Sequence, residues 1–525
     1  MKFNRTNLFP ILICIIFFLM YGFYPGTTFG QGKHKATELV ITNFDKHGNQ
    51  VIRYSNVGDA IDAHDGEIAL FNGIYYLYGT SYDCGFEWGN KNAPFCGFKV
   101  YSSKDMQNWT DRGFLFNAKT EVWQTRCNGN TYGCFRPHVV FNSNTQMYVL
   151  WINVYDNVSG YRVFTGKTPV GPFTEVAEPK LAVNSNAPVA GLNNGDHDTF
   201  IDDDGTAYLA YTDWRTKGTI VIEKLSSDYL TGTGEVVRSV TDGQTEAPGM
   251  FKRNGIYYVV YSDPNCGYCS GTGTSYKTAK SPLGPWSEGK KISDNSCGGQ
   301  PSFVSTIKLS SGNVYLFGSD LWNNAAKNEA LANYYWAPLT FNADGSIIPM
   351  TCDQPFKVTG SKVAKIPAVD IKNSSIKGLS DIAGDLKRSQ TFLAEQSGIL
   401  KTIYLPMYKT GSIDADLQVA IYRADINGNP QGKALASKTI PAKAIGWSVK
   451  RQVVHPAVTL MKGTAYCIVL SSATKKGAYG FTYNNGEHQN PQMTFGKLQR
   501  DSFVRENDKQ LNFSLIVTPI RSAGK

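Results

Sequence analysis

The stretch "NGIYYLYGT" (residues 72–80) joins a turn to an aromatic strand, and four further stretches of the chain repeat this pattern. The copies are "NTQMYVLWI" (144–152), "DGTAYLAYT" (204–212), "NGIYYVVYS" (254–262) and "SGNVYLFGS" (311–319). Their central tyrosines lie 72, 60, 50 and 57 residues apart, which leaves room for about four short strands in each unit. Five such units predict a five-bladed β-propeller over residues 38–350.

A propeller places the first strand of every blade around one central channel, so residues that precede the aromatic strands converge there. Three carboxylates have such positions: Asp65 before the first repeat, Asp196 before the third and Glu246 before the fourth. Glu246 begins the apolar stretch "EAPGM", and apolar surroundings raise the pKa of a carboxyl group. An acid, a base and a third carboxylate that tunes the acid are the groups that inverting glycoside hydrolysis requires.

The C-terminal part of the chain has a different pattern. Residues 351–385 lack a sustained period, and we interpret them as a connector. Residues 386–525 return to alternating apolar and polar positions, as in "LQVAIYRA" (417–424), which predicts a separate β-sandwich. Only Trp447 of the nine tryptophans falls there, so we expect an accessory domain without an aromatic sugar-binding platform. The whole chain is expected to be all-β.

The composition indicates a globular protein, with 42% hydrophobic, 13% aromatic and 18% charged residues among 525. The net charge of +9 comes without a run of lysines or arginines, which argues against nucleic-acid binding. Residues 1–30 join Lys2 and Arg5 to a long apolar stretch with small residues before Gln31, as in a signal peptide. We expect a secreted or periplasmic protein without a membrane segment in its mature form. A membrane anchor is the competing interpretation, because the apolar run approaches spanning length.

Nine cysteines follow the predicted signal peptide, and an odd number leaves at least one thiol free or paired between chains. In an exported chain, the close pairs Cys84/Cys96 and Cys127/Cys134 predict disulfides that staple loops. The "CGYC" at 266–269 has no second pair at zinc spacing, which favours a structural bridge over zinc or redox chemistry. Cys297 is a candidate partner for it.

Residues 58–350 resemble glycoside hydrolase family 43, whose members are five-bladed propellers that cleave arabinosides, xylosides and galactosides. The motif "EAPGMFKRNGIYYVVYS" (246–262) resembles the general-acid motif of that family, which implies the acid role for Glu246. Asp65 stands where the family places its base, before Gly-x-Tyr-Tyr. Asp196 matches the aspartate that tunes the acid and orients the substrate.

Within this family, the motifs "AHDGEI", "RPHVVFN", "EAPGMFKRNG" and "GGQPS" are most similar to the branch that contains exo-β-1,3-galactanases. In that branch a glutamine positions the attacking water, and Gln300 falls at its place here. However, Asp65 stands where the branch has glycine, and Phe135 stands where it has glutamate. These departures favour an Asp-based mechanism, as in an arabinofuranosidase, but leave Asp65 and Gln300 both open as the group that positions water.

The motifs imply no organic cofactor, and no metal-binding spacing such as HExxH occurs in the sequence. Candidate substrate-binding residues lie beside the proposed channel: His64, Arg136, His138, Asp198, Gln300 and Trp322. Asp198 is also the alternative to Asp196, because it lies two residues on and on the same strand face.

The sequence therefore predicts an exported, inverting exo-glycoside hydrolase. We expect it to cleave arabinofuranosyl or galactosyl residues from plant-type polysaccharide or glycan. The alternatives are a β-xylosidase of the same family and a propeller lectin that binds glycans without cleaving them. Three carboxylates before the repeats favour the enzyme, because a lectin has no need of them.

Overall fold

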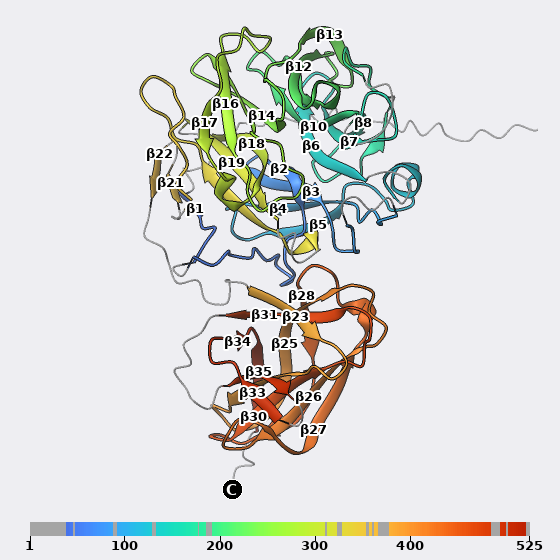
Figure 1. Cartoon of the computed structure of the whole chain (residues 1–525), viewed down its shortest axis with the longest axis vertical. Helices are drawn as coiled ribbons and strands as arrows, with labels where there is room; N and C mark the ends of the chain where they lie inside the picture. Colours follow the sequence, from blue (N-terminus) through green and yellow to red (C-terminus); the bar gives the residue numbers. More distant parts are fainter. Residues whose placement is uncertain are drawn as a thin grey trace, which may run out of the picture.

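The computed structural model describes residues 38–520 except 46–47, 88–91, 129–132, 177, 185–191, 310–311, 323–327, 353–355, 360–361, 366–376, 485–493 and 500–501. The predicted signal peptide, residues 1–30, lies outside this described part. Within it, no helix is both long enough and apolar enough to cross a membrane. The described chain is built almost wholly from strands, which form a propeller and a C-terminal sandwich (Figure 1).

Five antiparallel sheets form the propeller, and the aromatic repeats are the second strands of these sheets. The blades are β2–β5 (His64–Phe71, Ile74–Thr80, Phe98–Ser103, Thr110–Phe114), β6–β9 (Cys134–Asn142, Met147–Val154, Tyr161–Gly166, Thr174–Glu175), β10–β13 (Asn194–Ile201, Ala207–Asp213, Thr219–Leu225, Gly232–Val237), β14–β17 (Glu246–Arg253, Ile256–Ser262, Thr274–Ala279, Lys290–Ser293) and β18–β20 (Gln300–Leu309, Gly312–Leu321, Asn333–Pro338).

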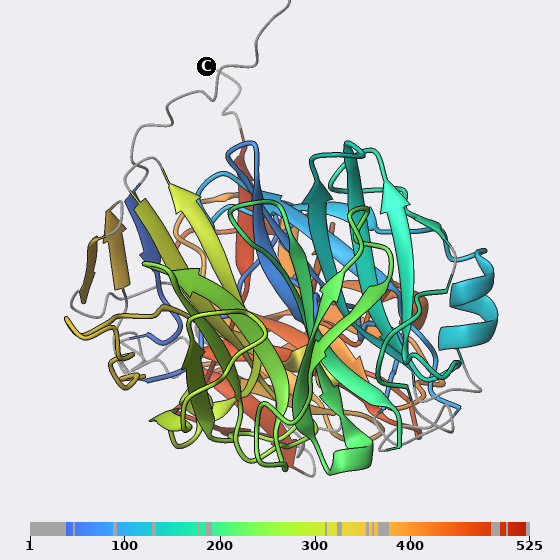
Figure 2. The same ribbon diagram turned by 90° about the horizontal axis from the view of Figure 1, so that it is seen from above.

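The inner strands β2, β6, β10, β14 and β18 contact one another in that order, and β18 contacts β2. Seen from the propeller end, the blue first blade lies between the teal second blade and the yellow fifth blade (Figure 2). The blades therefore close into a ring, which confirms the five-bladed propeller predicted from the repeats.

The repeated tyrosines explain why neighbouring blades adhere. Tyr258 of β15 stacks on Phe251 with ring centroids 4.7 Å apart, and Phe251 also contacts Tyr315 of the next blade at 4.7 Å. Tyr148 of β7 packs edge-on against Phe71 of the preceding blade at 5.1 Å. Because aromatic side chains bury large areas, one aromatic strand in each repeat supplies much of the packing between blades.

Strand β1 (Glu38–Ile41) pairs with β21 (Phe356–Thr359), which pairs with β22 (Lys362–Lys365). Just after β1, the Asn43 amide donates to the carbonyl of Trp336 on β20 and accepts from its N–H, both at 2.9 Å. The N-terminal segment is thereby held against the last blade.

The C-terminal body contains two antiparallel sheets. One sheet contains β23 (Lys377–Ile382), β25 (Gly398–Thr410), β28 (Lys450–Val454), β29 (Val458–Leu460), β31 (Ala478–Asn484), β34 (Gln510–Leu511) and β35 (Ser514–Pro519); the other contains β24 (Arg388–Leu393), β26 (Leu417–Ala424), β27 (Pro430–Ile440), β30 (Ala465–Ser471), β32 (Phe495–Gln499) and β33 (Ser502–Arg505). Buried residues from both sheets, such as Leu405 and Ile421, form one core. Strand β23 lies within the segment that we interpreted as a connector. The sequence did not predict this strand, because its pairing with β31 defines it and its residues show no sustained alternation.

The connection between β27 and β28 contacts the propeller, as Figure 1 shows at the upper end of the sandwich. Asp83 accepts from the N–H of Ser448 at 2.8 Å and forms an ion pair with Lys450 at 2.5 Å. The Trp447 indole packs on Gly85, where any side chain would collide with it. The sandwich is thus bonded to the loop that follows β3 in the first blade.

Candidate active site

Every inner strand of the propeller carries one extra residue near its start. The register shifts fall between His64 and Glu67, Phe135 and His138, Asn194 and His197, Glu246 and Gly249, and Pro301 and Phe303. Such β-bulges re-aim side chains and are common beside active sites. Asp65, Arg136 and Ala247 adopt positive φ values of 53°, 56° and 52° there, which costs about 1–3 kcal/mol each for a residue other than glycine. Five repeated distortions thus aim side chains from distant segments at one region.

Asp65 lies in the bulge of β2, and hydrogen bonds hold both of its carboxylate oxygens. Oδ1 accepts from Thr80 Oγ1 at 2.6 Å, and Oδ2 accepts from the Tyr82 hydroxyl at 3.1 Å. The backbone N–H of Asp65 donates to Asp320 at 2.9 Å. Burial raises the pKa of Asp65 to about 7, against the opposing effect of the Arg136 charge. A carboxylate with this pKa is a suitable base near neutral pH.

Glu246 is the first residue of β14 and is 5% exposed. Its Oε1 accepts from the Cys266 N–H at 2.8 Å and from Gln300 Nε2 at 2.7 Å. Burial, and then the negative charge of Asp196, raises the pKa of Glu246 to about 7. A substantial fraction of this carboxyl group is therefore protonated near neutral pH, as a general acid must be.

Arg136 joins the starts of three inner strands. Its guanidinium lies 3.0 Å from Asp196 Oδ2 on β10 and donates to the carbonyls of Ser302 at 2.7 Å and Pro301 at 3.1 Å on β18. The Asp196 side chain is 17% exposed, whereas Arg136 is 3% exposed. Arg136 therefore orients Asp196 through this ion pair, and the charge of Asp196 acts on Glu246.

Gln300 lies against the candidate acid. Its Nε2 donates to Glu246, while its Oε1 accepts from Trp322 Nε1 at 3.0 Å and from the Tyr268 N–H at 3.2 Å. Trp322 belongs to a cluster of buried aromatic residues: Tyr82, Phe86, Phe135, Tyr155, Tyr268 and Trp322. Of these, Tyr82 bonds directly to Asp65. Aromatic faces of this kind suit the apolar faces of sugar rings.

Two predicted substrate-binding residues lie one layer deeper in the channel. His138 Nδ1 lies 3.1 Å from Asp198 Oδ1 and 3.7 Å from Glu67 Oε2, and Asp198 Oδ2 accepts from the Met250 N–H at 2.6 Å. His138 has no exposed surface, and Asp198 is bonded to His138 and to the backbone of Met250 and not to Asp65 or Glu246. Strand alternation predicts that the side chains of Asp196 and Asp198 lie on the same face of β10. The bulge between Asn194 and His197 interrupts this alternation, and the two side chains have different partners. We therefore interpret His138 and Asp198 as supports of the channel.

His64 also lies beneath the candidate site. Its ring has no exposed surface, stacks on Tyr334 at 5.0 Å and lies 3.4 Å from both Asp62 and Asp320. Burial lowers the pKa of His64, but hydrogen bonds and the charges of the two carboxylates outweigh it and raise the pKa to about 9. A cationic His64 between two carboxylates supports the backbone of Asp65, which is bonded to Asp320.

Sequence reasoning missed the groups that hold the carboxylates in place. Thr80, Tyr82, Tyr268 and Asp320 each contact Asp65 or a residue bonded to it. The signal for Thr80 and Tyr82 was available, since Thr80 ends the first aromatic repeat and Tyr82 lies two residues after it. Among the described residues, no group of three or more His, Cys, Asp or Glu side chains has an arrangement that would hold a metal ion.

Four disulfides are present among the described residues. Cys84–Cys96 and Cys127–Cys134 form as predicted, whereas the CxxC cysteines pair with each other and Cys297 pairs with Cys352. The suggested partnership of Cys297 with the CxxC is therefore wrong, because Cys266 and Cys269 already satisfy each other. Cys467 is buried and free.

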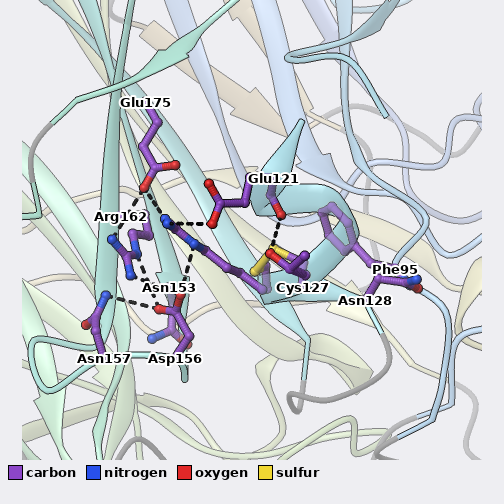
Figure 3. The surroundings of a disulfide bond; sticks show 12 residues. Phe95, Glu121, Cys127, Asn128, Asn153, Asp156, Asn157, Arg162 and Glu175 are labelled. Atoms are coloured by element: carbon purple, nitrogen blue, oxygen red, sulfur yellow. Dashed lines mark hydrogen bonds and ion pairs between the residues drawn. A yellow bond between two sulfur atoms is a disulfide. The ribbon is translucent and has the colours of Figure 1, made fainter. Parts of the chain in front are cut away.

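The Cys127–Cys134 disulfide closes the loop before β6, which carries Arg136. Figure 3 shows Cys127 at the end of the short helix η1 (Val122–Cys127), beside an ion-pair network. In that network, Arg162 lies 3.1 Å from Asp156 and 3.4 Å from Glu175. These bonds brace the outside of the second blade.

Comparison with known proteins agrees with this architecture. Residues 54–319 match the family model described as glycosyl hydrolases family 43. A β-D-galactofuranosidase from Aspergillus niger is 30% identical over 235 residues, 43% of this chain and 64% of that protein. An arabinoxylan arabinofuranohydrolase from Bacillus subtilis is 27% identical over 300 residues, 49% of this chain and 54% of that protein. The chain therefore covers less than two thirds of either curated relative.

Among solved structures, an exo-β-1,3-galactanase from Clostridium thermocellum has a similar fold, with a TM-score of 0.51. The similarity covers 90% of this chain and 99% of the galactanase chain at 18% sequence identity. At this identity the comparison concerns the fold alone.

Proposed function

The chain belongs to glycosyl hydrolase family 43, and from this premise we propose that it is an exported, inverting exo-glycosidase for arabinofuranosyl or galactosyl residues of plant-type polysaccharide. The observation that carries the proposal is the pair of buried carboxyl groups, Asp65 and Glu246, on inner strands of the first and fourth blades. Burial raises the pKa of both groups to about 7, which suits proton transfer near neutral pH. The two curated relatives, whose names specify furanosyl sugars, support the sugar class.

In the proposed reaction, Glu246 protonates the glycosidic oxygen as the bond to the leaving group breaks. Asp65 takes a proton from a water molecule that attacks the anomeric carbon from the opposite face, which inverts its configuration. Asp196, fixed by Arg136, keeps Glu246 protonated through its negative charge. Gln300 is bonded to Glu246, so we assign it the orientation of the acid, with Asp65 as the base.

The aromatic cluster holds the proposed catalytic groups in place. Tyr82 and Trp322 are each less than one tenth exposed, and they donate to Asp65 and Gln300 respectively. The four disulfides suit an oxidising compartment and support export.

A panel of p-nitrophenyl glycosides tests the sugar class. It contains α-L-arabinofuranoside, β-D-galactofuranoside, β-D-galactopyranoside and β-D-xylopyranoside, assayed with the parent chain and with Glu246→Gln. We expect turnover of an arabinofuranoside or a galactoside by the parent. On an oligosaccharide of the same sugar, whose leaving group is poor and needs the acid, we expect Glu246→Gln to lose at least about 100-fold in rate. Cleavage of the xyloside alone would replace the proposed sugar class. Glycan binding without any hydrolysis would favour the lectin.

A further inference from the structure

The loop closed by the Cys266–Cys269 disulfide contacts the groups around both proposed catalytic carboxyls. The Cys266 N–H donates to Glu246 Oε1 at 2.8 Å, and the Tyr268 N–H donates to Gln300, which itself donates to Glu246. The Tyr268 hydroxyl lies 2.9 Å from the hydroxyl of Tyr82, which donates to Asp65. Hydrogen bonds on both sides of Tyr268, joined through its own side chain, therefore link the acid to the base.

We propose that the Cys266–Cys269 disulfide is a positioning device that holds the backbone of this loop on the acid and Tyr268 between acid and base. The proposal rests on the proposed function, since it assigns the two carboxyls their roles. Both bonds to the acid side come from backbone N–H groups, so the conformation of the loop, and not a side chain, supplies them. Cys266 and Cys269 are positioning residues in this scheme.

The local sequence shows why the loop needs a cross-link. "DPNCGYCSGTG" (263–273) contains three glycines, a proline, an asparagine and a serine, a composition typical of flexible turns. Within the ring, Tyr268 has a φ of +54°, a conformation that is unfavourable for an aromatic residue. Closing the four-residue ring lowers the conformational entropy of the open loop and thereby stabilises this strained arrangement.

The bond from Cys266 also has an electrostatic consequence. An N–H that donates to a carboxylate stabilises the ionised form, and this bond lowers the pKa of Glu246 against the effect of burial. When the ring opens and the N–H moves away, the pKa of Glu246 rises further. A disulfide that only stabilised the fold would leave this pKa unchanged.

The Cys127–Cys134 disulfide is a matched control. It also closes a short loop before a strand of the site, but it borders the ion-pair network of Figure 3 and not the hydrogen-bond chain between the carboxyls. Removing it tests the general effect of losing a cross-link near the site.

The experiment compares the full chain with the double variants Cys266→Ser/Cys269→Ser and Cys127→Ser/Cys134→Ser. Activity is measured from pH 5 to 9 on an oligosaccharide of the sugar that the parent chain cleaves, because a poor leaving group makes the rate depend on the acid. In the first variant we expect kcat to fall about tenfold, the loss from one misplaced hydrogen bond to a charged group, with a smaller change in KM. The upper limb of its pH profile moves to higher pH, while that of the control variant stays in place.

A second measurement does not depend on turnover. The carboxyl titration of Glu246 is followed by infrared difference spectroscopy, with Glu246→Gln as the reference, before and after selective reduction and alkylation of Cys266 and Cys269. A rise in the Glu246 pKa supports the positioning role even if no glycoside is cleaved, in which case only the proposed function fails. An unchanged pKa and an unchanged pH profile would overturn the positioning role. The reduced parent chain also covers the case in which the serine variant does not fold.

Discussion

Replacing Glu246 with glutamine is expected to stabilise the folded protein at high pH and to change its stability little at low pH. Glu246 is 5% exposed, and burial together with the charge of Asp196 raises its pKa from 4.5 to about 7. In the unfolded chain the pKa returns to its ordinary value. The folded state therefore retains a proton over a pH range in which the unfolded chain has released it.

The sign and the size of the effect follow from this difference. Below pH 4.5 both states are protonated, so the group does not affect stability. As the pH rises from 4.5 to about 7 the folded state loses stability, and above that range the full cost is present. At about 1.4 kcal/mol for each pH unit, the cost amounts to about 3 kcal/mol. Glutamine avoids it, because it does not ionise and retains an oxygen that accepts from Cys266 and Gln300.

Calorimetric unfolding of the parent chain and of Glu246→Gln, at pH 4.5 and at pH 8.5, measures this difference. The exposed residue Glu288 lies on the same blade, so Glu288→Gln is the matched control and should leave the pH dependence as it is in the parent. We expect Glu246→Gln to unfold at a higher temperature than the parent at pH 8.5 only. Equal stabilities at pH 8.5, or a change of the same size at both pH values, would refute a raised pKa for this carboxyl group.

Four further predictions concern the catalytic groups and the domain contact. Asp65→Asn should lower kcat at least about 100-fold, and activated leaving groups should not restore it, because the attacking water still needs a base. If Asp65→Asn is active and Gln300→Ala is inactive, Gln300 and not Asp65 positions the attacking water. The ratio kcat/KM should fall above pH 7, because Glu246 ionises there, and below pH 7, because Asp65 becomes protonated there. A flat profile from pH 6 to 9 would contradict both assignments. Proton NMR should show the inverted anomer as the first product, and a retained anomer would exclude Asp65 as the base. Asp83→Ala removes the side chain that bonds to Ser448 and Lys450. It should speed proteolysis of the connector and lower kcat severalfold, because Asp83 is adjacent to Tyr82, which bonds to Asp65. Unchanged proteolysis and kcat would show that this contact is dispensable.

The fold could be predicted because its signal is local and repeated. A turn followed by an aromatic strand, as in residues 72–80, contains its own strand propensity and the surface that packs on the next blade. The same repeats located Asp65, Asp196 and Glu246, since each precedes an aromatic strand at a similar distance. The family resemblance then gave these positions their expected roles.

The two layers of the channel could not be predicted in this way. A strand pattern with a period of two puts Asp196 and Asp198 on one face, but the extra residue in β10 interrupts that period. His64 and His138 likewise precede or follow proposed site residues in sequence, yet they lie buried beneath the site. A bulge depends on the pairing with the neighbouring strand, which a single strand sequence does not contain.

The sequence by itself determined the number of blades, because the repeats that encode it are short stretches. The roles of the three carboxylates and the bounds of the domains stay predictions from the same stretches. Only the tertiary structure decided which groups hold those carboxylates: Tyr82 and Thr80 on Asp65, and Gln300 and the Cys266–Cys269 loop on Glu246. It also decided the pairing of Cys297 with Cys352 and the docking of the sandwich on Asp83. These contacts join residues far apart in the chain, and their burial, which raises the pKa of both carboxyls, exists only once the blades have closed into a ring.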